Sequence, residues 1–166
     1  MNENQPQGQQ PYQQVPQQPY QQAPQQPYQQ PYVPARQLNT SRSLLKFILL
    51  SIITIGIYAL VYFSSVSESI NAAASRYDGK KTMHFCLLAF IITPITFGIA
   101  SFVWYHRVSN RIGNELNRRG LGYSFSAADY WLWYFLGSII IVGPFVYIHK
   151  MSKAMNLICA DYNARG

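Results

Sequence analysis

The chain has 166 residues, a formal net charge of +7 and a mean hydropathy close to zero. That mean describes neither part of the chain, because a polar N-terminal segment precedes a strongly apolar body. The positive charge raises the question of nucleic acid. The sequence carries no RNA-binding or helix-turn-helix signature, so we expect no nucleic-acid partner.

Residues 1–38 form the polar segment. They hold 15 Gln residues, 8 of the 10 Pro residues and two charged side chains, Glu3 and Arg36. Such a composition buries too little apolar surface to offset chain entropy, so it predicts a disordered tail. Within it Pro-Tyr-Gln-Gln recurs every eight residues. This repeat is either a contact element for a protein partner or an inert solubilising tether.

Residues 39–166 contain three uncharged apolar stretches, at about 47–67, 85–105 and 130–148. Each is close to the roughly 20 residues that cross about 30 Å of hydrocarbon as a helix. The body is therefore predicted to be an all-α membrane domain with three transmembrane helices. Trp and Tyr cluster at the ends of the stretches, and Lys and Arg lie between them, which favours a lipid bilayer with anionic headgroups as partner.

These spans predict a multi-pass protein of the cell membrane. The basic residues divide seven to six between the two sides, which hardly biases insertion. The long N-terminal segment shows no signal peptide, so we expect a cytoplasmic N-terminus. A homo-oligomer is a further hypothesis, because three spans are few for a working membrane assembly.

The three stretches are copies of one unit. A ten-residue pattern begins at Tyr62, Trp104 and Tyr147 and carries Ser at its sixth position each time. Such regular similarity indicates an internal repeat. Apolar residues continue at helical spacing beyond each stretch, which predicts that each span is continued by an amphipathic helix near the membrane surface.

Capping residues predict where these helices begin and end. Starts are expected at Ser41 or Ser43, at Thr82, and at Ser126 with Asp129 as its capping partner. Stops are expected at the glycines that follow each amphipathic stripe, which are Gly79, Gly120 and Gly166.

Short motifs inside the first two stretches carry a family resemblance. Thr54-Ile55-Gly56-Ile57-Tyr58 is followed by Tyr62-Phe63, and Thr96-Phe97-Gly98-Ile99 repeats its core. This pattern resembles the bacterial membrane family known as domain-of-unknown-function family 4234, over about residues 40–160. The sequence departs from it where Ala100 replaces the second Tyr. The resemblance implies a multi-span bacterial membrane protein and supplies no activity.

Glycines and prolines inside the stretches are the candidate site residues. We predict helix-packing or kink points at Gly56, Pro94, Gly98, Gly143 and Pro144. The three histidines, His84, His106 and His149, stand at the edges of the stretches, where interfacial side chains are expected rather than metal ligands.

The sequence predicts no catalytic residue, no cofactor and no metal, and therefore no enzyme. Ser43 and Lys46 match the spacing Ser-x-x-Lys of acyl enzymes, but the accompanying motifs are absent and Lys46 fits an interfacial anchor. Cys86 and Cys159 have no metal-ligand spacing and do not indicate a disulfide framework. The leading hypothesis is a non-enzymatic membrane scaffold or assembly component with the tail as contact element. The alternative is a small transport or permeability component.

Overall fold

The structure is a computed structural model that describes residue 34 and residues 36–166. The chain divides into two units, Met1–Gln30 and Pro31–Gly166, and all described residues belong to the second. Of the tail predicted over 1–38, residues 1–33 and residue 35 lie outside the described part. Leu38, the last residue of that prediction, is buried.

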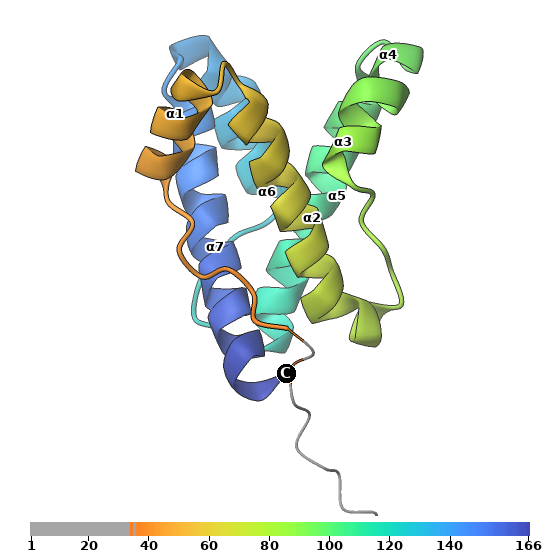
Figure 1. Ribbon diagram of the computed structural model, residues 1–166, viewed down its shortest axis with the longest axis vertical. Helices are drawn as coiled ribbons and strands as arrows, with labels where there is room; N and C mark the ends of the chain where they lie inside the picture. The colour runs from red at the N-terminus through yellow and green to blue at the C-terminus, as the bar shows by residue number, and fades with distance from the viewer. Residues whose placement is uncertain (1–33, 35) are drawn as a thin grey trace, which may run out of the picture. The chain divides into compact units, whose positions relative to one another are not determined.

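The second unit is a set of three helical hairpins (Figure 1). The first hairpin consists of α1 (Leu44–Ile53) and α2 (Ile57–Asp78). The second consists of α3 (Phe85–Leu87), the π-helical η1 (Leu88–Ile92), α4 (Thr93–Ile95) and α5 (Ile99–Arg118). The third consists of α6 (Ala127–Asp129), the π-helical η2 (Tyr130–Phe135), the 3₁₀ segment η3 (Leu136–Ile140) and α7 (Gly143–Arg165).

The prediction of three transmembrane helices is wrong. Each stretch, 47–67, 85–105 and 130–148, contains a chain reversal near its middle instead of one straight helix. Within residues 36–166 no helix combines the length and apolarity that crossing a membrane requires. The predictions of a membrane-spanning fold class, of a transmembrane protein and of multi-pass cell-membrane localisation with a cytoplasmic N-terminus are corrected accordingly.

Left-handed backbone at the middle of the first two stretches causes the reversal there. Ile55 and Gly56 both have positive φ, at 49° and 85°, and Phe97 and Gly98 repeat this at 50° and 88°. A right-handed helix cannot continue through two such residues, so the chain turns back. Hydropathy measures how apolar a stretch is and does not detect this backbone change.

The first two turns share one hydrogen-bond pattern, displaced by 42 residues. The amide of Gly56 donates to the carbonyl of Ser51, and that of Gly98 donates to the carbonyl of Thr93. Thr54 Oγ1 donates to the Leu50 carbonyl in one turn, as Thr96 Oγ1 does to the Ile92 carbonyl in the other. The repeated Thr-x-Gly-Ile motif is therefore the sequence of a helical-hairpin turn.

The amphipathic stripes beyond the turns form the core. They lie on α2, α5 and α7, which contact one another. Buried stripe residues are Val66, Ile70, Ala73, Ala74, Val108, Ile112, Leu116, Met151, Met155, Ile158 and Tyr162. The helical spacing was thus predicted correctly, but the stripes face each other within the protein, which corrects the expected position at a membrane surface.

Two of the three predicted helix starts are confirmed. Ser43 caps α1 by accepting from the Lys46 amide, and Ser126 forms a capping box with Asp129. The start at Thr82 is wrong, because α3 begins after His84. Thr82 instead exchanges two hydrogen bonds with the side chain of Asn71. The predicted stop at Gly79 is the left-handed C-cap of α2.

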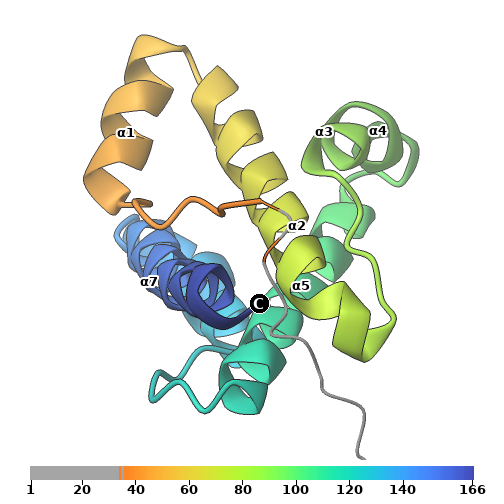
Figure 2. The ribbon, with the colours of Figure 1, turned by 60° about the horizontal axis from the view of Figure 1, so that its bottom comes forward.

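The three hairpins form a ring of contacts. Each hairpin contacts the chain segment that leads into the next hairpin. Asn71 of the first hairpin pairs with the backbone of Thr82, and Asn156 of the third pairs in the same way with the backbone of Arg42. At the equivalent position in the second hairpin, a Cβ on Gly113 would lie 2.2 Å from the Phe125 carbonyl. In Figure 2 α2 runs between α1 and α3.

Candidate functional site

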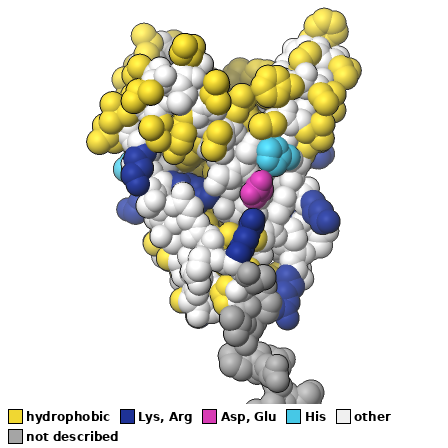
Figure 3. Space-filling model, viewed as in Figure 1, with side chains coloured by type: hydrophobic (Ala, Val, Ile, Leu, Met, Phe, Trp, Pro, Cys, Tyr) yellow, Lys and Arg dark blue, Asp and Glu magenta, His cyan; other side chains and the backbone are white. Residues whose placement is uncertain are grey.

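One end of the hairpin unit is covered by exposed apolar side chains from the three turns. We name this set the apolar crown, and it consists of Ile52, Ile53, Ile55, Ile57, Ile95, Phe97, Ile99, Ile139, Ile140 and Ile141. In Figure 3 hydrophobic side chains gather at this end, over the tips of α1 and α4, with Lys, Arg and His below them. Contiguous exposed apolar surface of this kind marks an interaction site.

Three of the exposed crown residues are also conformationally strained. Ile55 is 93% exposed, Phe97 is 96% exposed and Ile141 is 75% exposed, and all three have positive φ. A left-handed conformation costs an L residue roughly 1–2 kcal/mol. A bulky apolar residue at such an exposed position gains nothing from burial within this unit, and Gly or Asn would relieve the strain. The apolar character of the tips therefore points to contact with something outside the unit.

The threonine hydroxyls of the first two turns are satisfied within the turns. The Thr54 hydroxyl donates to the Leu50 carbonyl and accepts from the Tyr58 amide, at 2.6 and 2.9 Å. Thr96 does the same with the Ile92 carbonyl and the Ala100 amide. Ser138 donates to the Tyr134 carbonyl near the third turn. Such internal pairing is what a water-poor surrounding requires of polar groups.

A band of basic and histidine side chains lies next to the crown. Lys46 donates to the Ser41 carbonyl at the base of α1, and Lys150 forms an ion pair with Asp129. His84 lies 3.4 Å from Glu68, and His106 accepts a hydrogen bond from Trp131. His149 is exposed on α7. The three histidines thus have separate surroundings.

Buried ion pairs occupy the opposite half of the unit. Arg111, on α5, donates from Nε to Asp78 Oδ2 at 2.7 Å and also bonds Asn71, Thr82 and Ser75. Burial raises the pKa of Asp78, but hydrogen bonds from Arg111 and the Lys80 amide outweigh it, so the pKa is lowered overall. This network ties the end of α2 to α5.

A second network joins α5 to α7. Arg119 Nε lies 2.6 Å from Glu115, and Arg119 Nη1 lies 2.6 Å from Asp161. Burial raises the pKa of Asp161, but hydrogen bonds from Arg119 and Arg165 outweigh this effect, so the pKa is lowered overall. These charges already have structural partners. The sequence reasoning missed both networks, because their members are separated by 33 and 42 residues.

The five predicted packing or kink residues lie at the turns. Gly56 and Gly98 are the left-handed residues that cap α2 and α5, and a Cβ on either meets no atom within 4 Å. Pro94 lies in α4, directly before the second turn. Gly143 begins α7, where a Cβ would lie 2.4 Å from the Gly137 backbone, and Pro144 follows it.

The crown residues themselves were assigned to span interiors by sequence reasoning. The signal that locates them is the repeated Thr-x-Gly at the centre of the first two stretches, since glycine readily adopts the positive φ that a chain reversal uses. Ser43 of the Ser-x-x-Lys pair caps α1. Within the part that the structure describes, no three His, Cys, Asp or Glu side chains come together as metal ligands.

The comparisons with known proteins add one finding. Neither the curated proteins nor the solved structures gave a match. A family model does match, over the first hairpin and most of the second, and its match ends before the third hairpin begins. Residues 42–114 match the domain of unknown function DUF4234, which confirms the resemblance predicted from the Thr-x-Gly-Ile motifs.

Proposed function

We propose that this protein is a non-enzymatic scaffold that docks on one leaflet of a lipid bilayer through its apolar crown. The observation that carries the proposal is the exposure of strained apolar residues, Ile55, Phe97 and Ile141, at the three hairpin turns. A lipid leaflet is the occupant that accepts an apolar surface bordered by positive charge.

The length of the first hairpin arm supports insertion into one leaflet only. α1 has 10 residues, which correspond to about 15 Å of helix. The hydrocarbon core is about 30 Å thick. An arm of this length reaches the middle of the bilayer and returns, so both ends of the hairpin stay on the same side.

The scaffold part of the proposal rests on how the charged residues are used. Arg111, Arg119, Glu115 and Asp161 hold helices together in ion pairs. Charged side chains that are engaged in ion pairs between helices have a structural rather than a catalytic role. The alternative of a transport or permeability component remains a sequence-based hypothesis, and no contact in the described part favours it.

The N-terminal segment is the proposed contact element for a protein partner. Its Pro-Tyr-Gln-Gln repeats precede Leu38, whose backbone pairs with the side chain of Asn163 at 2.7 and 2.8 Å. A deletion of residues 2–33 therefore removes the repeats and leaves that pairing intact. If partner capture is unchanged by this deletion, the segment is not the contact element.

Vesicle flotation tests the docking. Ile55→Ser, Phe97→Ser and Ile141→Ser together should abolish flotation with phosphatidylcholine–phosphatidylglycerol vesicles, because the variant loses the apolar tips. The matched control changes the same three positions to Leu, which keeps them apolar, and should float like the parent chain. Circular dichroism checks that both variants fold.

Two results would contradict the proposal. Equal flotation of the Ser and Leu variants would show that the crown does not touch lipid. A Ser variant that floats normally but changes its size in solution, measured by sedimentation, would instead assign the crown to a contact between copies of this chain.

A further inference from the structure

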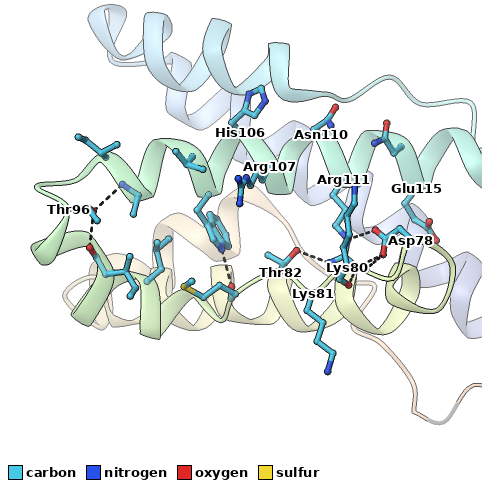
Figure 4. A pocket seen from close by; sticks show the side chains of 18 of the residues that line it. Asp78, Lys80, Lys81, Thr82, Thr96, His106, Arg107, Asn110, Arg111 and Glu115 are labelled. Atoms are coloured by element: carbon cyan, nitrogen blue, oxygen red, sulfur yellow. Dashed lines mark hydrogen bonds and ion pairs between the residues drawn. The ribbon is translucent and has the colours of Figure 1, made fainter.

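A groove of about 980 Å³ runs along α5, between that helix and the segment from the end of α2 to η1. Its two ends differ in chemistry. Near the crown it is lined by apolar side chains of Leu88, Ile92, Ile99 and Val103, whereas its far end is lined by polar and charged groups. Figure 4 shows the labelled residues from Thr96 at one end to Glu115 at the other.

The far end of the groove is already neutralised. Arg111 bonds Asp78, and Glu115 is held by Arg118 and Arg119. Neither carboxylate is therefore an isolated negative charge that would repel an anion. Arg111 also donates to the Lys80 carbonyl, so its guanidinium is fully used by the protein.

Arg107 stands between the two ends. It is exposed, lines the groove, and finds no acceptor among the residues that the structure describes. In Figure 4 it lies on α5 between Thr96 and Arg111. Lys81, on the opposite wall, is exposed, but its side chain points away from α5 in Figure 4. Arg107 is therefore the cation at the middle of a groove with an apolar end, and this surface is complementary to an anionic amphiphile.

We infer that this groove binds one anionic phospholipid, with its phosphate at Arg107 and an acyl chain along Ile99 and Val103. The eight residues from Ile99 to Arg107 correspond to about 12 Å of helix. This is the length of groove available to an acyl chain below its headgroup. The source of the lipid is the leaflet in which the crown sits, so this part rests on the proposed docking.

Binding itself is measured without a bilayer. The probe is dihexanoyl phosphatidylglycerol below its micelle-forming concentration, titrated by isothermal calorimetry into the full chain. Dihexanoyl phosphatidylcholine has the same chains without net charge, and inorganic phosphate has the charge without chains. We expect saturable binding of phosphatidylglycerol and at least about tenfold weaker binding of the other two. The trimethylammonium group of phosphatidylcholine offsets its phosphate charge, and inorganic phosphate lacks the acyl chains that fill the apolar half.

Two variants test the two halves of the groove. Arg107→Gln removes the free cation and should weaken phosphatidylglycerol binding about tenfold. Val103→Trp fills the apolar half while leaving Arg107 in place, and should abolish binding. Val103 is exposed, so the larger ring fits without disturbing the core. Lys153→Gln, which makes the same change of charge on α7, is the control and should bind like the parent chain.

Several outcomes would overturn the inference. If phosphatidylcholine binds as tightly as phosphatidylglycerol, net charge plays no part in recognition. If inorganic phosphate binds as tightly, the groove is an anion site and does not recognise the acyl chains. An equal loss in Lys153→Gln would reduce it to a general charge effect. Binding only after deletion of residues 2–33 would make the chain's own N-terminal segment the occupant.

The result also separates the groove from the crown. Loss of phosphatidylglycerol binding with vesicle flotation intact overturns the groove alone. Retained binding in a chain that does not float with vesicles overturns the leaflet as the source of lipid and leaves the groove standing.

Discussion

Tyr62, Trp104 and Tyr147 occupy the same position in the three copies of the repeat, and two of them bond the repeated serine of another copy. Tyr62 Oη lies 2.7 Å from Ser152 Oγ, and Tyr147 Oη lies 2.8 Å from Ser109 Oγ. Trp104 has no hydroxyl and donates to the Met83 carbonyl. Ser109 and Ser152 therefore link hairpins, whereas the equivalent Ser67 donates to the Phe63 carbonyl of its own helix.

Removing either hydroxyl tests these links. Tyr62→Phe or Tyr147→Phe should lower the free energy of unfolding by about 1–3 kcal/mol, because each leaves a buried serine without its partner. Denaturant unfolding measures the change. Tyr58→Phe, whose hydroxyl bonds no described residue, should stay within about 0.5 kcal/mol of the parent. Equal effects at all three positions would contradict the account.

The lowered pKa values of Asp78 and Asp161 predict acid sensitivity. Each carboxyl is ionised more easily in the folded chain than in the unfolded one, so its stabilisation is present above the ordinary carboxyl pKa. It is lost as the pH falls through the lowered folded value. Unfolding free energies measured from pH 7 down to pH 3 should therefore decline. Asp78→Asn should flatten that decline, and an unchanged slope would show that the Arg111 pair is not its cause.

At the scale of elements, the hairpin turns decide the architecture. Ile55–Gly56 and Phe97–Gly98 reverse the chain within stretches that are long enough and apolar enough to read as spans. The helical stripes on α2, α5 and α7 could be predicted because their period is local. The reversals could not be read from hydropathy, since the residues before and after each turn are equally apolar.

Substitution of the turn glycines tests their conformational role. Gly56→Ala or Gly98→Ala should each destabilise the protein by about 1–2 kcal/mol, because alanine disfavours positive φ. Both sites have open space, so crowding does not contribute. Gly122→Ala is the control, since Gly122 has open space without positive φ, and it should change stability by less than about 0.5 kcal/mol. Thermal unfolding of the three variants gives the comparison.

At the scale of the whole hairpin unit, the chain closes on itself. The third hairpin holds the entry to the first through Asn156 and Arg42, as the first holds the entry to the second through Asn71 and Thr82. The repeat could be read from sequence, but the closure could not, because Arg42 and Asn156 are 114 residues apart. The groove around Arg107 was equally hidden, since its walls come from two hairpins.

Circular permutation tests the closure. New termini between Gly122 and Tyr123, with a short flexible linker joining Gly166 to residue 36, should preserve the fold, because the ends are already held together at Leu38 and Asn163. Far-ultraviolet circular dichroism and a cooperative unfolding transition report the outcome. A permuted chain that no longer unfolds cooperatively would show that the order of hairpins, not their ring of contacts, maintains the unit.

The central claim is that three apolar turns enter one leaflet without crossing it. A nitrobenzoxadiazole label attached at a cysteine replacing Phe97, in a chain with Cys86 and Cys159 changed to Ser, reports this on vesicles to which the protein is added from outside. We predict a blue-shifted label that is slowly reduced by external dithionite, while the same label at Ser124 stays in water and is reduced at once. A label at position 97 that behaves like the one at 124 would contradict the account.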